Sequence, residues 1–247
     1  MSKPLEGKLA LVTGGSRGIG AAIAKRLAAD GASVAITYAK GADAAASVVE
    51  SIERAGGRAI AIQADAVDAR AVGAAMEKAV ATFGGLDVLV NNAGTAIPKR
   101  FEEATLEELD RVIDINLRGT FIATQQALKR MNDGGRIVMI GSCVGERMMT
   151  PGLAAYAATK GAIKMFAQGL SREVADRGIT VNNIQPGPID TELNPAAGEW
   201  AIPQTANTAL KRYGTVDDIA AIVSFVDGPE ASYVTGASLT VDGGTNA

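Results

Sequence analysis

The sequence contains no histidine and only one cysteine, Cys143, among its 247 residues. A Ser-His-Asp triad is therefore excluded, and a zinc site of the usual Cys/His type has too few ligands, so we expect no bound metal. One cysteine cannot form an internal disulfide, which favours a reducing compartment. Any general acid or base must then be a Tyr, Lys, Asp or Glu side chain.

Long hydrophobic runs are also missing. Residues 1–8 are polar and mixed, and the apolar run 9–12 is too short for a signal peptide or a membrane span. The net charge of −3 argues against a nucleic-acid-binding protein that works through a basic surface. We therefore expect a cytoplasmic protein that binds neither nucleic acid nor membrane.

Short β-branched runs alternate with alanine-rich amphipathic stretches, and no linker divides the chain. This alternation predicts one α/β domain over residues 1–247, with a doubly wound, mostly parallel, seven-stranded sheet flanked by helices. The expected strands are 9–13, 33–38, 58–64, 86–91, 136–141, 180–185 and 238–241. The expected helices are 19–29, 42–55, 68–83, 106–131, 153–176 and 216–226. The stretch 186–210 has no clear period, and we expect a substrate lid at about 187–210.

A glycine-rich turn follows the first expected strand and opens the first expected helix. It reads Thr13-Gly14-Gly15-Ser16-Arg17-Gly18-Ile19-Gly20. Glycine lets the backbone turn sharply and approach a pyrophosphate, while the helix N-terminus offers free N–H groups and a positive dipole end. The turn predicts a dinucleotide site, although an ordinary glycine-rich βα turn has the same composition.

The second expected strand ends at Tyr38 without the acidic residue that NAD sites usually place there for the ribose hydroxyls. Arg17 and Lys40 instead offer two cations, which favours the 2′-phosphate of NADP over NAD. The alternative is that both are solvated surface charges. Asp43, a few residues further on, is an acid that would favour NAD.

Polar residues also follow the third and fourth expected strands. Asp65 could bind an adenine amino group or cap a loop, and the sequence leaves both open. The turn Asn91-Asn92-Ala93-Gly94 follows a parallel strand, and such sheets bind ligands at the carboxyl ends of their strands. A plain Asn/Gly turn is the alternative.

A second motif combines a phenol with an ammonium group. Tyr156 and Lys160 are four residues apart on an expected helix, so they share one face. A free phenol has a pKa of about 10, and a neighbouring ammonium group lowers it. Ser142 could hydrogen-bond a substrate oxygen, and Asn116 could anchor a water that relays protons to Lys160. The alternatives are a chance Tyr-x-x-x-Lys pair, a turn serine and a kinking asparagine.

Together these motifs resemble the short-chain dehydrogenase/reductase family over nearly the whole chain, from residue 8 to residue 244. The matching segments are 13–20, 91–94, Asn116, Ser142, Tyr156 with Lys160, and 186–191. The resemblance implies a Rossmann fold, an NAD(P) cofactor and a homotetramer or homodimer. It also implies a catalytic tetrad of Asn116, Ser142, Tyr156 and Lys160, in which Tyr156 exchanges the proton with the substrate oxygen and Lys160 also binds ribose.

The motifs and the resemblance give two sets of expected contacts. Those with the cofactor are Gly14, Ser16, Arg17, Gly18, Ile19, Gly20, Tyr38, Lys40, Asp65, Asn92, Ala93, Gly94, Tyr156, Lys160, Pro186, Gly187, Ile189 and Thr191. Those with the substrate are Ser142, Met148, Leu153, Tyr156 and Trp200, which are mostly apolar and favour a hydrophobic or modestly polar carbonyl compound.

The leading hypothesis is an NADPH-dependent reductase that converts a ketone or aldehyde reversibly to an alcohol. Much of the chain is also similar to 3-oxoacyl-acyl-carrier-protein reductases. The stretches 141–148, 185–198 and 228–236 look closer to cyclic-di-GMP-binding biofilm dispersal mediators. The alternatives are therefore a carrier-protein reductase and a nucleotide-binding regulatory protein of the same fold.

Overall fold

Seven parallel strands form one sheet at the centre of the molecule, in the order β3-β2-β1-β4-β5-β6-β7. This computed structural model describes residues 3–247. The strands are β1 (Leu9–Val12), β2 (Ser33–Tyr38), β3 (Arg58–Gln63), β4 (Leu86–Asn91), β5 (Met131–Ile140), β6 (Thr180–Pro186) and β7 (Ser238–Val241). The expected doubly wound, seven-stranded parallel sheet is confirmed.

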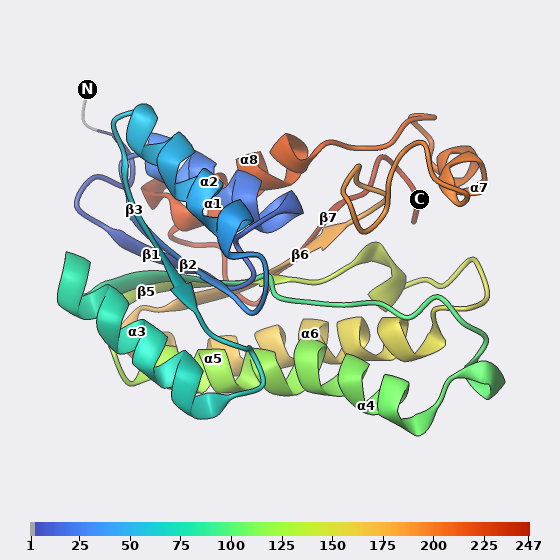
Figure 1. The fold of residues 1–247 in the computed structure, drawn as a ribbon, viewed down its shortest axis with the longest axis horizontal. Coiled ribbons are helices and arrows are strands. Elements are labelled where there is room, and N and C mark those ends of the chain that lie inside the picture. The colour runs from blue at the N-terminus through green and yellow to red at the C-terminus, as the bar shows by residue number, and fades with distance from the viewer. Residues whose placement is uncertain (1–2) are drawn as a thin grey trace.

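Helices cover both faces of the sheet (Figure 1). One face carries α1 (Gly18–Ala29), α2 (Ala42–Arg54) and α8 (Val216–Asp227). The other carries α3 (Ala69–Phe83), α4 (Leu106–Ile113), α5 (Gly119–Leu128) and α6 (Ala154–Glu173), while α7 (Ala201–Asn207) lies at one end of the molecule. Among residues 3–247, no helix is long and apolar enough to cross a membrane.

The strands are buried on both sides, because each face of the sheet has its own apolar core. In β1, Ala10 and Val12 pack into the core beneath α1 and α8. Leu9 and Leu11 alternate with them and pack into the core shared with α3, α5 and α6. This arrangement explains why β1 reads as a continuous apolar run instead of an alternating one.

The long helical region expected over residues 106–131 is present from Leu106 to Leu128, but it is not one regular α-helix and it ends earlier than expected. Helix α4 ends at Ile113, a π-helical turn spans Asp114–Arg118, and α5 follows from Gly119 to Leu128. The backbone stays right-handed at both junctions, so the helical periodicity of the sequence passes through the turn unchanged. Met131, expected in the helix, is the first residue of β5.

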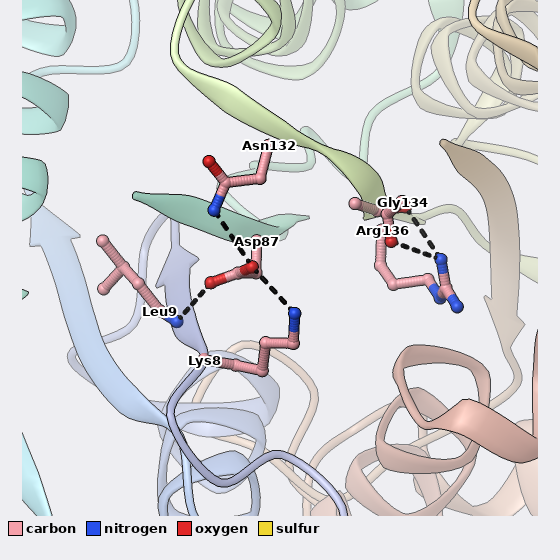
Figure 2. A network of polar contacts seen from close by, with 7 residues as sticks. Lys8, Leu9, Asp87, Asn132, Gly134 and Arg136 are labelled. Atoms are coloured by element: carbon pink, nitrogen blue, oxygen red, sulfur yellow. Dashed lines mark hydrogen bonds and ion pairs between the residues drawn. The ribbon is translucent and has the colours of Figure 1, made fainter. Parts of the chain in front are cut away.

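Strand β5 begins five residues earlier than expected, because a polar network fixes its start (Figure 2). The buried carboxylate of Asp87 accepts hydrogen bonds from Lys8 Nζ at 3.0 Å, the Leu9 amide at 2.9 Å and Asn132 Nδ2 at 3.2 Å. This carboxylate ties together the first residues of β1, β4 and β5. Gly134 and Gly135 lie inside this early part of β5, and because glycine is uncommon in strands, the sequence did not predict a strand there.

The stretch 186–210, expected to lack regular structure, contains helix α7. Its third residue, Pro203, resembles a helix breaker in the sequence. Proline is tolerated there, because the N–H groups of a first helical turn have no partner inside the helix. Helix α6 is shorter than expected, ending at Glu173, and a 3₁₀ turn, Ala175–Arg177, follows it.

Asp227, the last residue of α8, carries a buried carboxyl group. Within residues 3–247, neither of its oxygens has a hydrogen-bond partner. Burial raises the pKa of this group well above its usual value, although the charge of Arg136 acts in the opposite direction. The folded protein therefore keeps this proton at pH values where the unfolded chain has released it.

We expect Asp227→Asn to stabilise the protein, because stability falls as the pH rises from about 4 towards the raised pKa of Asp227. Removing this ionisation should increase the free energy of unfolding at pH 7.5 by about 1–3 kcal/mol, or several degrees in Tm. Thermal unfolding at pH 4.5 and pH 7.5 measures the effect, and the gain should shrink at the lower pH. A lower Tm of the variant, or the same gain at both pH values, would contradict this account.

Candidate active site

The expected site residues gather at the carboxyl ends of the central strands. Strand β1 pairs with β2 on one side and β4 on the other, so the chain reverses its direction of winding there. Doubly wound sheets bind ligands at such a switch point. Segments 13–20, 91–94, 141–147 and 186–191 follow β1, β4, β5 and β6 and supply the candidate residues.

The glycine turn after β1 depends on glycine at three positions. Gly14 and Gly18 adopt left-handed backbone conformations, with φ of +63° and +53°. A Cβ atom on Gly20 would lie 2.4 Å from Asn92 Nδ2, so a side chain there would displace Asn92. The turn leads directly into α1, whose first turn contains no acidic residue, and its N–H groups remain available to an anion.

Asn92, expected to contact the cofactor, uses its amide nitrogen to hold this turn. Its Nδ2 donates to the carbonyl oxygens of Thr13 at 2.9 Å and Gly14 at 3.0 Å. Thr13 Oγ1 in return accepts from the backbone amides of Asn92 and Ala93. Thr13 was expected as part of the glycine-rich turn, but the role of its hydroxyl in joining β1 to the segment after β4 was not expected. Both donors of the Asn92 amide serve the turn, which leaves only its oxygen for a ligand.

The two cations expected at a 2′-phosphate, Arg17 and Lys40, are both exposed. In the part of the chain that the structure describes, neither forms an ion pair. Asp65 caps its own loop, since its Oδ1 accepts from the Val67 amide at 3.2 Å. Tyr38 is half-buried and packs against the core under α1.

Tyr156 and Lys160 lie on one face of α6, as their spacing predicts. Lys160 Nζ lies 5.6 Å from the centroid of the Tyr156 ring and donates to the Ile140 carbonyl at 2.7 Å. The Lys160 side chain is buried, and Ile140 is the last residue of β5, two positions before Ser142. The lysine therefore joins α6 to the strand end that carries Ser142.

We expected Lys160 to lower the pKa of Tyr156, but in this structure the pKa of Tyr156 is raised above that of a free phenol. Burial raises the pKa of Tyr156 to about 12, and a hydrogen bond with Ser142 only partly offsets this effect. Burial also lowers the pKa of Lys160 to about 8. The ammonium group is directed at the Ile140 carbonyl, and the phenol is desolvated. Tyr156 is therefore a neutral phenol at neutral pH, able to donate a proton.

Asn116 lies in the π-helical turn and is buried. Its side chain bridges the backbone of Thr95, accepting from the Thr95 amide at 2.8 Å and donating to the Thr95 carbonyl at 2.9 Å. It also donates to Thr159 Oγ1 at 3.1 Å, and Thr159 donates to the Tyr156 carbonyl at 2.7 Å. Asn116 is thus tied to the helical turn that carries Tyr156. Sequence reasoning missed Thr159, which is three residues after Tyr156 and so shares its face.

Gly94 lies beside two catalytic candidates, and Gly187 lies where a neighbouring residue leaves no room for a side chain. A Cβ atom on Gly94 would lie 3.4 Å from Asn116 Oδ1 and 3.7 Å from Lys160 Nζ, which places Gly94 beside both. A Cβ atom on Gly187 would lie 2.5 Å from the Asp242 Cα. Gly94 therefore brings the segment after β4 directly against the Lys160 ammonium group.

The expected substrate residues come from three segments. Leu153 is the N-cap of α6 and is partly buried. Met148 follows a 3₁₀ turn, Cys143–Gly145, which Ser142 caps and which we call the Ser142 turn. Trp200 directly precedes α7. Met148 is 38% exposed and Trp200 50% exposed, so both are accessible to a ligand. Among the expected nicotinamide contacts, Ile189 is buried and Thr191 is partly exposed.

The chain is similar to known proteins over nearly its whole length. A sequence model of a family described as enoyl-(acyl carrier protein) reductase matches residues 14–246. The chain is 46% identical over 248 residues to an uncharacterised oxidoreductase of Methylorubrum extorquens, with 99% of each chain covered. It is 43% identical over 241 residues to the cyclic-di-GMP-binding biofilm dispersal mediator protein of Escherichia coli, with 98% of each chain covered.

Solved structures show the same fold. A short-chain dehydrogenase of Burkholderia cenocepacia, solved in complex with NADP, aligns with a TM-score of 0.97 at 52% identity. The alignment covers 99% of this chain and 100% of that chain. With the parallel sheet, the glycine turn and the Ser142, Tyr156 and Lys160 cluster in place, the chain belongs to the short-chain dehydrogenase/reductase family.

Proposed function

We propose that this protein is an NADPH-dependent oxidoreductase that reduces a ketone or aldehyde reversibly to an alcohol. The observation that carries the proposal is the placement of the partly buried Tyr156, whose phenol is hydrogen-bonded to Ser142 and whose ring centroid lies 5.6 Å from Lys160 Nζ. A phenol that stays protonated at neutral pH is suited to donate a proton to a carbonyl oxygen. The catalytic residues of the proposal are Asn116, Ser142, Tyr156 and Lys160.

The residues at the switch point fit a dinucleotide with a 2′-phosphate. The turn at Gly14 and Gly18 and the N-terminus of α1 would hold the pyrophosphate. Arg17 and Lys40, both exposed, would hold the 2′-phosphate. NADP bound to the Burkholderia cenocepacia relative supports this choice. When bound, NADPH would supply the hydride.

The chain's own side chains would handle the proton. Tyr156 donates its phenolic proton to the substrate oxygen, and the Ser142 hydroxyl donates a hydrogen bond to the same oxygen. Ser142 Oγ accepts from the Val144 amide at 3.4 Å, and its hydroxyl also forms the hydrogen bond with Tyr156, so both groups would face the same substrate oxygen. Lys160, held by Ile140, keeps a positive charge beside the phenolate that forms, and Asn116 anchors the relay that returns the proton.

The substrate of the proposed reaction is a hydrophobic or modestly polar carbonyl compound. The side chains proposed to line the site, Met148, Leu153 and Trp200, carry no charge. Residues 187–210, with helix α7, form the proposed lid over the substrate. We also propose that the protein works in the cytoplasm, where a single buried cysteine is kept reduced.

The proposed assembly is a homotetramer or homodimer. Exposed apolar side chains on the α4–α6 layer, Ile113, Phe121 and Met165, support this proposal. Light scattering of the purified protein should give a mass of two or four chains, and a monomer at micromolar concentration would contradict it.

A second candidate function is nucleotide binding without important turnover. The 43% identity to the cyclic-di-GMP-binding biofilm dispersal mediator of Escherichia coli favours it. The retained Tyr156 and Lys160 favour catalysis, because a pure binding protein does not need both. A carrier-protein reductase would require a free basic surface. Lys129, Arg130 and Arg172 are the residues that could supply such a surface, and Arg130 pairs with Glu77 at 2.6 Å.

The experiment that tests the reductase is NADPH consumption over a panel of aromatic ketones, diketones, ketoesters and a 3-oxoacyl thioester, with NADH in parallel. Turnover of at least one small carbonyl compound supports the proposal. Strong preference for a carrier-bound thioester would favour the carrier-protein reductase. Tight binding of NADPH without turnover of any compound would favour the binding protein, and calorimetry with cyclic-di-GMP would then test that function.

A further inference from the structure

Residues 242–247, which we call the closing segment, follow β7 and turn back towards the candidate active site. Both carboxylate oxygens of Asp242 accept backbone hydrogen bonds at 2.9 Å, from the Gly244 and Asn246 amides. Thr245 Oγ1 donates to the Asp242 carbonyl at 2.6 Å. These internal bonds fix the closing segment in one shape. In Figure 1 the end of the chain lies beside the loops near α7.

The closing segment holds the turn that carries Ser142. Asn246 Nδ2 donates to the Cys143 carbonyl oxygen at 2.8 Å, from a side chain 103 positions away in the sequence. Arg147 Nη1, at the other end of the turn, donates to the Ala247 carbonyl oxygen at 3.3 Å. Of these two contacts, the one at Cys143 is nearer to Ser142 in the sequence, because Cys143 directly follows Ser142.

Side chains from two other elements hold the neighbouring carbonyl groups. Lys160 on α6 donates to the Ile140 carbonyl at 2.7 Å, and Gln185 on β6 donates to the Ser142 carbonyl at 3.3 Å. The carbonyls of Ile140, Ser142 and Cys143 are therefore each fixed by a different part of the chain. Asn246 provides the last of these three contacts.

The same segment also contacts the proposed lid. The Leu210 amide donates to the Gly243 carbonyl at 3.0 Å. Gly244 has φ of +79°, and a Cβ atom there would lie 2.6 Å from the Ala209 Cβ. The closing segment thus lies between residues 208–210 and the Ser142 turn, and it contacts both.

We propose that Asn246 is a positioning residue, which orients Ser142 through its hydrogen bond to the Cys143 carbonyl. The inference rests on the proposed reductase function. Ser142 is the N-cap of a 3₁₀ turn, Cys143–Gly145, whose direction sets where the hydroxyl points. Without the Asn246 contact, the Cys143 carbonyl keeps its local hydrogen bonds from the Glu146 and Arg147 amides but loses its link to the closing segment. Misplacing a group that contacts the reacting oxygen lowers the rate more than it lowers binding.

The test compares Asn246→Ala with Thr245→Val, both alone and in a Ser142→Ala background. Thr245→Val removes only a hydrogen bond inside the closing segment, so it is the matched control. We expect Asn246→Ala to lower kcat about 10-fold, with the Kd of NADPH and the KM of NADPH within about twofold of wild type. We expect Thr245→Val to behave like wild type, and Asn246→Ala to have no further effect once Ser142 is alanine.

Asn246→Asp keeps the size of the side chain while replacing the donor by an acceptor, so it serves if the alanine variant does not fold. It should lower kcat at least as much. Equal kcat values for the Asn246 and Thr245 variants, or a full Asn246 effect in the Ser142→Ala background, would overturn the inference. Loss of turnover in Tyr156→Phe does not depend on these results, so it tests the proposed reductase function separately from the role of Asn246. A wild-type protein without turnover overturns both.

Discussion

Tyr156→Phe is expected to lower kcat for carbonyl reduction about 1,000-fold while leaving the Kd of NADPH nearly unchanged. Phenylalanine keeps the ring that packs beside Lys160 Nζ, and the hydrogen bond from Lys160 to the Ile140 carbonyl does not involve the phenol. The variant therefore loses the proton donor and retains its surroundings. Single-turnover measurements of NADPH oxidation, with fluorescence titration of NADPH, separate the chemical step from binding.

Tyr233→Phe is the matched control, because it makes the same substitution at a fully exposed side chain. It should keep wild-type kcat. A Tyr156→Phe variant that still turns over within tenfold of wild type would show that another group delivers the proton. Equal loss of activity and of NADPH binding would indicate a collapsed site and would contradict the catalytic assignment of Tyr156.

The parts of this molecule that sequence reasoning predicted are those set by local pattern. The glycine turn is an example, since Gly14 and Gly18 need left-handed conformations that few other residues adopt. The Tyr156 and Lys160 pair is another, because helical spacing alone places both on one face. The parallel, doubly wound sheet followed from the alternation of strands and helices, which favours parallel crossovers.

The parts that sequence reasoning missed depend on contacts between distant segments. The π-helical turn at Asn116 is fixed by hydrogen bonds to Thr95 and Thr159, which no local window contains. The early start of β5 depends on Asp87, 45 positions before Asn132. The raised pKa of Tyr156 depends mainly on burial by the assembled fold, which no local sequence pattern displays.

Removing the two exposed cations near the glycine turn should change the cofactor preference. We expect the double variant Arg17→Gln/Lys40→Gln to raise the KM for NADPH about 100-fold, because each cation forms a charge-assisted contact with the 2′-phosphate. The KM for NADH should change less than threefold, since NADH lacks that phosphate. The NADPH effect should also weaken with salt, because both side chains are exposed and salt screens exposed charges.

Lys25→Gln provides a control for the loss of a nearby positive charge, because Lys25 is exposed on α1, the helix that Arg17 directly precedes. It should leave both KM values unchanged. Steady-state kinetics with NADPH and NADH at 20 mM and 300 mM salt would measure the three proteins side by side. An NADPH preference that survives in the double variant would assign the 2′-phosphate to other groups. An equal rise in the KM values of both cofactors would mean that Arg17 and Lys40 hold the pyrophosphate or the turn itself. The proposed preference for NADP would then be supported only by the relatives.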